Sequence, residues 1–407
     1  MKSLLNKLLA FFFCIYVILA AYPGTGVLSL GDIIMISLVF FTFLSYQTLV
    51  YYNELKLFSI YVILQTLLII LLNRPYISQV GAFNRLLAMV LLYFVASYVS
   101  MYADRSAFLK IYTIVSIICM AGIVFQFAQV WIFHTGKTIL IPFYSLASKD
   151  ETLLLSSIRP TSFFLEPQHF ASFILPLLVI ELRRQNIIFS AIITLCIFLC
   201  TSTQGIVLAG IVWIIYFVAF RDIRKWAKML AVVVIIVFAL LGTQTDLFIT
   251  TIEKAGNYTF SDSMRLFRAF EIYKDMPIMD KITGIGTKIV NNYISVTGVA
   301  SIWYRNPLTE SRNFISSFFG NFVEFGFIGG ILYLAMLVTM FKNGRTTGKT
   351  VVIIIILSSL SMTITYNVWF VFYFCMYQFL KDESYLNILE GNRKLIRVKS
   401  KSSSMPI

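Results

Sequence analysis

Residues 111–133, IYTIVSIICMAGIVFQFAQVWIF, form an apolar run of 23 residues without one charged side chain. As a helix, such a run extends for about 35 Å, which is enough to cross the roughly 30 Å hydrocarbon core of a bilayer. The run therefore predicts a membrane-spanning helix.

The rest of the chain repeats this pattern. The 407 residues are 59% hydrophobic and 13% charged, with a mean hydropathy of +0.84. A soluble protein of this length could not bury so much apolar surface, so the composition indicates a polytopic membrane protein. Because lipid offers the backbone no hydrogen-bond partners, we expect an all-α fold, with residues 1–407 forming one integral membrane domain.

Runs of about twenty apolar residues predict about twelve transmembrane helices, with eleven to thirteen as the range. The division within 187–220 and within 350–380 stays open. The candidate spans are 5–22, 33–52, 57–72, 86–103, 111–133, 169–182, 187–202, 205–220, 228–243, 314–341, 350–365 and 366–380.

The net charge of +14 is spread between the apolar runs and forms no single patch, which argues against a nucleic-acid-binding protein. With the N-terminus inside, the inner loops and the basic tail 381–407 collect most Lys and Arg, whereas the outer loops 23–32 and 201–204 have none. This distribution obeys the positive-inside rule and predicts that both termini are cytoplasmic. The first apolar run resembles a signal peptide, but we expect an uncleaved first span.

The five cysteines all fall inside apolar runs, so we expect no disulfide outside the membrane. The chain has two histidines, and neither a metal site nor a cofactor is expected.

Two long connections are predicted on the outer side, at 134–168 and 244–313. The first ends in RPTSFFLEPQHFA (residues 159–171), an unusually polar segment before an apolar run. Pro167 suits the first turn of a helix, and Glu166 then lies just before the helix N-terminus, where negative charge is favoured. The alternative interpretation is a capped helix entry, with Arg159 reaching to the membrane interface.

The second connection contains FSDSMRLFRAFEIYKDMP (residues 260–277), which predicts a helix that begins at Ser261 or Asp262 and stops before the final proline. Arg265 and Arg268 are three positions apart and project to the same side. Two guanidinium groups on one rigid surface suit a diphosphate, which accepts forked donors. The alternative is a helix at the interface whose arginines are solvated, or paired with Asp262 or lipid phosphate.

The next segment, TGIGTKIVNNY (residues 283–293), has too few glycines for a nucleotide-binding fingerprint and predicts a tight turn. The late span ESRNFISSFFGNFVEFGFIGG (residues 310–330) holds Glu324 within an apolar run, which suggests either a functional group or a pairing between helices. Its four glycines predict close helix packing.

In this order, the segments resemble the Wzy-type polysaccharide polymerases and the related O-antigen ligases over roughly residues 155–340. That family has an Arg-x-x-Gly/Ser-x-Phe-x-Glu-Pro-Asn-like motif before a span, similar to RPTSFFLEPQ here, and a short Thr-Ser-x-x-Gly-type turn, similar to TSTQG (residues 201–205). An outer arginine followed by a Pro-x-x-Gly-x-Gly-like turn resembles residues 263–286. A His-Asn…Glu-x-Gly-x-x-Gly motif resembles residues 311–330.

One departure separates the two branches of the family. The histidine expected before Asn in the ligases is absent, because Arg312 precedes Asn313, and the spacing from there to Glu324 is too long. The departure favours a polymerase over a ligase that uses a histidine base.

The resemblance implies a GT-C-like membrane glycosyltransferase in the inner membrane of a bacterium. It would join glycan repeat units carried on undecaprenyl diphosphate into O-antigen or a similar surface polysaccharide, by inverting transfer on the outer face. A chain-length regulator protein is an implied partner. The alternatives are an O-antigen ligase that transfers glycan to lipid A core and a flippase or transporter for lipid-linked sugars.

The resemblance also assigns roles to residues. Glu166 is the preferred base for the acceptor hydroxyl, and Arg159 and Arg265 are the preferred partners of the diphosphate. A carboxylate beside arginines keeps a low pKa and is a weak base, so Glu166 could equally orient Arg159. The residues expected to bind substrate are Arg268, Arg312, His169, Asn313 and Glu310, and the rival bases are His169, Asp262 and Glu310.

Overall fold

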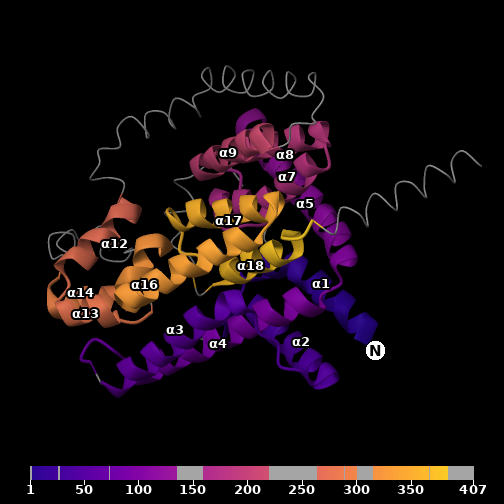
Figure 1. The fold of residues 1–407 in the computed structure, drawn as a ribbon. Helices are drawn as coiled ribbons and strands as arrows, with labels where there is room; N and C mark the ends of the chain where they lie inside the picture. The colour runs from indigo at the N-terminus through magenta and orange to yellow at the C-terminus, as the bar shows by residue number, and fades with distance from the viewer. Residues whose placement is uncertain are drawn as a thin grey trace, which may run out of the picture.

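The computed structural model describes residues 2–25, 28–72, 74–134, 159–219, 264–287, 289–299, 315–365 and 367–383. This part of the chain is almost entirely helical, as predicted (Figure 1). Its two strands, β1 (Pro23–Thr25) and β2 (Leu28–Ser29), pair antiparallel in a small hairpin. The helices are α1 (Lys2–Leu19), α2 (Leu30–Tyr46), α3 (Asn53–Leu71), α4 (Gln79–Tyr102), α5 (Arg105–Phe127), η1 (Ala128–Ile132), α7 (Pro167–Arg183), α8 (Ile187–Leu199), α9 (Thr203–Ala219), α12 (Met264–Asp275), α13 (Ile278–Thr283), α14 (Val290–Thr297), α16 (Ser317–Asn343), α17 (Thr346–Ser359) and α18 (Val368–Leu380).

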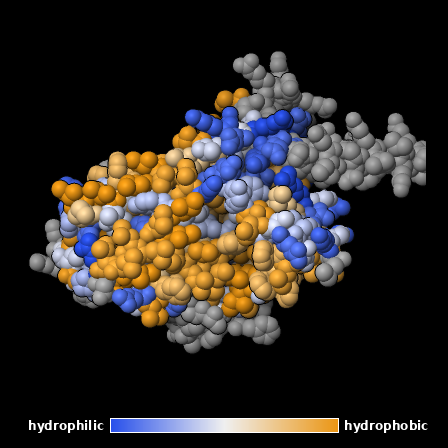
Figure 2. All heavy atoms as spheres, turned by 60° about the horizontal axis from the view of Figure 1, so that its bottom comes forward, coloured by the Kyte–Doolittle hydropathy of each residue, from blue (hydrophilic) through white to orange (hydrophobic). Residues whose placement is uncertain are grey.

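Within the described residues, five helices are long and apolar enough to cross a membrane: α1, α3, α4, α5 with its π-helical extension η1, and α16. In the same part of the chain, five shorter helices are also apolar: α2, α8, α9, α17 and α18. Figure 2 looks onto the side where α3 and α4 lie and shows a broad hydrophobic surface, with most of the hydrophilic residues gathered at its upper right. The long apolar helices indicate a membrane protein.

Most predicted spans coincide with helices. Each of the two regions whose division stayed open contains two helices, α8 and α9 in residues 187–219 and α17 and α18 in residues 346–380. The predicted span 33–52 is too long at its end, because α2 stops at Tyr46 and Gln47 takes a left-handed conformation with φ 53°. The predicted span 228–243 lies outside the described residues.

The bundle has two ends with different character. At one end, Lys381 forms an ion pair with Glu54 (Nζ to Oε1, 3.7 Å), and its carbonyl accepts a hydrogen bond from the backbone N–H of Arg345 (2.9 Å). At the same end, Arg183 pairs with Glu383 (3.0 Å). We call this the basic end. The end where α1 finishes and α7 and α16 begin is called the cavity end.

Helix α7 is the centre of the bundle and is buried from Phe170 to Leu182. Pro176 interrupts it and has no N–H group to donate to the carbonyl of Ser172. The hydroxyl of Tyr373, from α18, donates to that carbonyl instead (3.2 Å). The next carbonyl, of Phe173, accepts from the hydroxyl of Tyr112 on α5. Two phenols from neighbouring helices thus support the proline site.

Helix α16 is broken at Gly326, whose backbone is non-helical (φ 69°, ψ −175°). The turn at 284–286 packs into the break: the N–H of Ile285 donates to the carbonyl of Val323 (3.1 Å), and that of Gly286 to the carbonyl of Glu324 (2.9 Å). The predicted tight turn is therefore present, and Gly284 and Gly286 both have positive φ. Gly326 allows the expected close approach, since a Cβ there would lie 2.2 Å from the carbonyl oxygen of Ile282, and it also interrupts the helix.

Helix α3 completes this arrangement. The amide of Gln65 donates to the carbonyls of Thr283 (2.9 Å) and Glu324 (3.0 Å), and the hydroxyl of Tyr61 donates to the carbonyl of Phe325 (2.8 Å). We call this set of hydrogen bonds between α3, the 284–286 turn and α16 the clasp. It provides hydrogen-bond donors for the carbonyl groups that lose their helical partners at the break.

A second core lies beside the clasp, where α12, α13 and α14 pack on the first half of α16 and on the connection between α3 and α4 (Figure 1). Its buried side chains include Ile272 and Tyr293, and the ring of Tyr293 meets that of Tyr76 at 4.9 Å. The hydroxyl of Tyr293 donates to Asp280 (3.0 Å), which also lies 3.8 Å from Arg74. The three short helices thus form a cap anchored on the bundle.

The clasp predicts that Gly326→Ala strongly destabilises the protein. A Cβ at Gly326 would lie 2.2 Å from the carbonyl oxygen of Ile282, and its φ of 69° is unfavourable for any other residue. Gly298 also has a φ of 69°, but its ψ of 5° lies in the left-handed helical region and no atom lies within 4 Å of a Cβ, so Gly298→Ala measures the milder strain of that region without a clash. We expect losses of about 3 kcal/mol for Gly326→Ala and about 1 kcal/mol for Gly298→Ala, measured by thermal unfolding in detergent. Equal losses of stability in the two variants would contradict the tight contact between Gly326 and Ile282.

The basic end predicts a dependence of stability on pH. Burial alone would raise the pKa of Glu383, but hydrogen bonds from the hydroxyl and N–H of Thr347 and the charge of Arg183 outweigh it and lower that pKa. A carboxylate whose pKa is lowered by folding stabilises the folded state. This stabilisation is complete above the pKa of the unfolded chain, about 4.3, and is lost as the pH falls below that value. The difference in unfolding midpoint between wild type and Glu383→Gln should therefore be constant from pH 7 to pH 5 and shrink below pH 4.5. A difference that grows on acidification contradicts this assignment.

Candidate functional site

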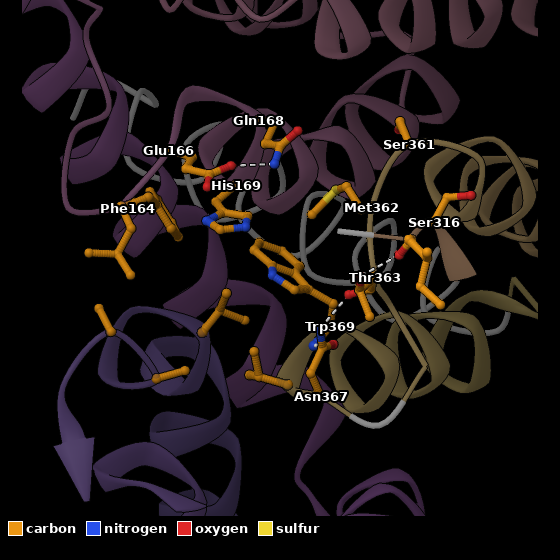
Figure 3. Close-up of a pocket in the computed structure, with 16 residues that line it drawn as sticks. Phe164, Glu166, Gln168, His169, Ser316, Ser361, Met362, Thr363, Asn367 and Trp369 are labelled. Carbon is orange, nitrogen blue, oxygen red and sulfur yellow. Dashed lines mark hydrogen bonds between the residues drawn. The ribbon is translucent and has the colours of Figure 1, made fainter. Parts of the chain in front are cut away.

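A cavity of about 270 Å³ opens at the cavity end of the bundle (Figure 3). Its wall combines the end of α1, the segment that leads into α7, the start of α16 and the connection between α17 and α18. These four pieces are far apart in the sequence, so the fold creates the cavity. The wall residues are Val17, Ala20, Ala21, Phe164, Leu165, Glu166, Gln168, His169, Ile315, Ser316, Ser361, Met362, Thr363, Asn367, Val368 and Trp369.

Glu166 lies at the mouth of this cavity. It is the residue before the first turn of α7, in an extended conformation (φ −141°, ψ 148°), with Pro167 at the first helical position, as predicted. Its carboxylate makes no capping bond to the helix backbone and instead accepts a hydrogen bond from the amide of Gln168 (Figure 3). The carboxylate is thus placed by α7 and oriented by a neighbouring side chain.

His169 lies beside Trp369 in the cavity wall (Figure 3). The two rings are stacked, with centroids 5.3 Å apart and planes at 29°. Asn367 and Thr363 lie on the same side as Trp369, where the amide of Asn367 donates to the carbonyl of Thr363 and its oxygen accepts from the N–H of Trp369 (2.9 Å). This wall fixes the tryptophan ring beside the imidazole.

Gln126 of α5 holds the segment that carries the motif. Its side-chain oxygen accepts hydrogen bonds from the backbone N–H groups of Thr161 (2.9 Å) and Ser162 (2.6 Å). The hydroxyl of Ser162 donates to the carbonyl of Cys119 (2.8 Å), also on α5. Ser162 has a positive φ of 54°, which turns the chain back toward α7. Helix α5 therefore sets the position from which residues 163–166 reach the cavity.

Arg159 lies near the start of α7 but is not part of the cavity wall in the described structure. Its charge acts on the thiol of Cys200, and that thiol is 3.7 Å from the carbonyl oxygen of Pro167. Arg159 is half-buried, so its guanidinium is accessible to solvent or to a ligand. The fold thus brings Arg159, Glu166 and His169 to the same end of the bundle.

The arginine helix is found as α12 and ends at Asp275, as predicted. Phe270 and Tyr273 of α12 pack on Phe319 and Phe322 of α16. Arg268 is buried (8% exposed) rather than solvated. Burial lowers its pKa, and the nearby carboxylate of Glu271 partly offsets that effect.

The remaining predicted site residues receive no structural account. The side chain of Arg265 lies outside the described residues, as do the other candidates from the second outer connection. These are Asp262, Glu310, Arg312 and Asn313.

Glu324 is buried (7% exposed) in the first half of α16. Its carboxylate interacts electrostatically with Arg85 of α4, and Arg85 donates to the carbonyl of Thr287 (2.7 Å). This electrostatic interaction between α16 and α4 agrees with the interpretation of Glu324 as a group that pairs two helices.

Several residues of the site were not found from the sequence. Gln126 had a detectable signal, because it is a polar residue in the uncharged run 111–133. Trp369 and Thr363 had none, since each lies in a segment whose composition only indicates a helix or a short turn. Their role depends on contacts between distant parts of the chain.

The cavity offers a carboxylate, an imidazole, an amide and several hydroxyl groups beside an aromatic ring. Such a lining can accept and donate hydrogen bonds to a hydroxyl-rich ligand while it excludes bulk water from one side. The described residues contain no group of three or more His, Cys, Asp or Glu placed to hold a metal ion. The five cysteines are buried free thiols.

A scan against protein-family models finds no match to this chain, and no curated protein matches it either.

Proposed function

We propose that this protein is a multi-pass membrane glycosyltransferase that lengthens a polysaccharide carried on undecaprenyl diphosphate, as the Wzy-type polymerases do. The observation that carries the proposal is the cavity into which the fold places Glu166, Gln168 and His169 of the motif. A hydroxyl-rich sugar suits the hydrogen-bonding groups of this wall. The proposal includes about twelve transmembrane helices in a GT-C-like arrangement.

The proposed orientation places the cavity end outside and the basic end in the cytoplasm of the bacterium, with both termini inside. Support comes from the basic end, where Lys2, Lys56 and Lys381 each lie over a tyrosine ring at 4.7, 5.4 and 5.7 Å. Lysines collect on the cytoplasmic side, and tyrosines are enriched at the interface. The donor and the acceptor would then meet at the outer face of the inner membrane.

In the proposed reaction, a hydroxyl oxygen of the acceptor sugar attacks the anomeric carbon of the donor. The bond from that carbon to the diphosphate oxygen breaks, the diphosphate leaves with the electron pair, and the configuration inverts. Glu166 takes the proton of the attacking hydroxyl or, in the alternative role, orients Arg159. Arg159, Arg265 and, in support, Arg268 stabilise the charge that develops on the diphosphate.

The substrate-binding roles proposed for His169, Arg312, Asn313 and Glu310 follow from the same resemblance. A chain-length regulator is the proposed protein partner, because a polymerase by itself does not define how long its product becomes. The product would be O-antigen of lipopolysaccharide or a related surface polysaccharide.

Gene deletion in the native cell tests this function directly. Loss of long glycan chains with single repeat units retained at the surface is the expected result. Loss of all repeat units with accumulation outside would identify a ligase, and accumulation inside would identify a flippase. Either of those results would overturn the proposal.

Glu166→Gln tests the role of the carboxylate. Glutamine keeps an oxygen that can accept a hydrogen bond from Arg159, but it cannot take a proton. If Glu166 is the base, elongation of lipid-linked repeats by purified protein in liposomes should fall at least about 100-fold. Retention of more than a tenth of the rate would assign Glu166 to orienting Arg159. The control is Arg345→Ala, an exposed residue at the basic end that should leave the rate unchanged.

Arg159→Ala tests the proposed binding of the diphosphate. Loss of one charge-assisted contact should lower the elongation rate by about 10-fold to 100-fold. Normal elongation by a well-expressed Arg159→Ala variant would remove this residue from the site.

The orientation is tested by cysteine labelling of intact cells. All native cysteines are buried, so a membrane-impermeant maleimide should give little background. We expect Ser361→Cys, at the cavity, to be labelled from outside and Arg345→Cys only after the membrane is permeabilised. The reverse pattern would invert the proposed topology.

A further inference from the structure

A second hollow lies at the basic end, far from the cavity described above. A groove of about 290 Å³ runs between α3 and α4 with an almost entirely apolar lining that includes Leu55, Ile63 and Val90. Its neighbour is a more polar pocket of about 530 Å³ whose wall includes Asn53, Glu54 and Lys381. Tyr51 and Tyr52 line both, so the two hollows are adjacent. We call them the α3–α4 groove and the headgroup pocket.

The groove opens on a surface suited to lipid. Ile60 and Phe94, from its two walls, are 44% and 38% exposed, and the same side of the molecule is broadly hydrophobic in Figure 2. Neither α3 nor α4 covers this surface with polar side chains. An extended hydrocarbon chain fits such a groove by shape and polarity.

The chemistry changes along the groove. Lys56 lies at its mouth, 5.4 Å over the ring of Tyr51, and Lys381 lies 5.7 Å from the centroid of the Tyr52 ring. Glu54 neutralises part of this charge through its ion pair with Lys381 (3.7 Å). One net positive charge remains among these three groups, so the mouth favours an anionic headgroup.

Two polar atoms of the groove wall have no protein partner in the described structure. They are the hydroxyls of Ser59 and of Tyr93, and Tyr93 is only 9% exposed. A buried hydroxyl without a partner costs about 1–3 kcal/mol. The Tyr93 hydroxyl interacts electrostatically with Tyr333 of α16, which leaves Ser59 as the group of the groove wall that favours a ligand with a hydrogen-bond acceptor.

The spacing of Lys56 and Ser59 indicates what kind of ligand this is. They are one helical turn apart on the same side of α3, about 5 Å along its axis. From the headgroup toward its chains, a glycerophospholipid presents its phosphate first and its ester carbonyls next, which is the order of Lys56 and Ser59 along α3. Phosphate beside Lys56 and an ester oxygen beside Ser59 would satisfy both groups, whereas an isoprenoid phosphate has no ester carbonyl to offer.

We propose that the α3–α4 groove and the headgroup pocket bind one anionic glycerophospholipid of the surrounding bilayer. One acyl chain lies in the groove, and the phosphate lies between Lys56 and Lys381. The inference does not rest on the proposed glycosyltransferase function. Because α3 also carries Tyr61 and Gln65 of the clasp, the bound lipid steadies the helix that holds the break in α16.

The test compares palmitoyl-oleoyl phosphatidylglycerol with the phosphatidylcholine of the same chains. Each lipid is titrated into the purified full-length protein in detergent and followed by native mass spectrometry and by the thermal unfolding midpoint. Phosphatidylglycerol should bind more tightly and raise the midpoint further. Equal binding and equal shifts for the two lipids would overturn the proposal.

Variants locate the site. Lys56→Gln should weaken phosphatidylglycerol binding about fivefold, and Val90→Phe, which fills the groove, should abolish it. Their matched controls are Lys349→Gln, a lysine over the ring of Phe341 outside the groove, and Val80→Phe, an exposed position at the other end of α4. If a control matches its test variant, the site lies elsewhere and the proposal is wrong.

Ser59→Ala separates the two possible lipids. It should weaken phosphatidylglycerol binding and leave the binding of undecaprenyl phosphate unaffected. If undecaprenyl phosphate displaces phosphatidylglycerol at equal concentration, the groove belongs to the lipid carrier and the phospholipid assignment is overturned.

Discussion

The structure depends on how the broken backbone at Gly326 is satisfied. Within an apolar bundle, each carbonyl left without a helical partner costs several kcal/mol unless another donor reaches it. The carbonyls of Val323, Glu324 and Phe325 are in this position, and all three accept hydrogen bonds from outside the helix. Two donors come from the 284–286 turn and the others from α3. The break therefore joins three segments that the sequence separates widely.

The position of the cavity wall follows from this constraint. The first half of α16 begins at Ser317, directly after two residues of the wall, and the clasp fixes its other end. The N–H of Ser317 donates to the carbonyl of Met362 (3.0 Å), and its hydroxyl oxygen accepts from the N–H groups of Ile364 (2.6 Å) and Thr365 (3.0 Å). The connection that leads to Trp369 is thus bonded to the same half-helix. A shift at the break would move the wall opposite Glu166.

Features set by local composition could be predicted from the sequence. Apolar length located most of the helices, and Pro167 located the start of α7 with Glu166 before it, because both depend on neighbouring residues only. The clasp could not be predicted, because Gln65 and Glu324 are 259 positions apart. A polar residue in an apolar run indicates that it needs a hydrogen-bond partner, but the sequence does not identify that partner. Trp369 was missed for a related reason. An aromatic residue that lines a cavity cannot be distinguished from one that packs in the core until its neighbours are known.

The polar side chains of this bundle differ in the groups with which they form hydrogen bonds. Gln65, Gln126, Tyr112 and Tyr373 donate to or accept from backbone groups, each at a place where the helical pattern fails or the chain turns. Such residues are explained by backbone satisfaction alone. Glu166 differs, because its carboxylate accepts a hydrogen bond from another side chain of the cavity wall, that of Gln168, and makes no capping bond to the helix that it precedes. A carboxylate that supports no backbone group and is held at a helix entry is free to serve a ligand, which is the role that the proposed function gives it.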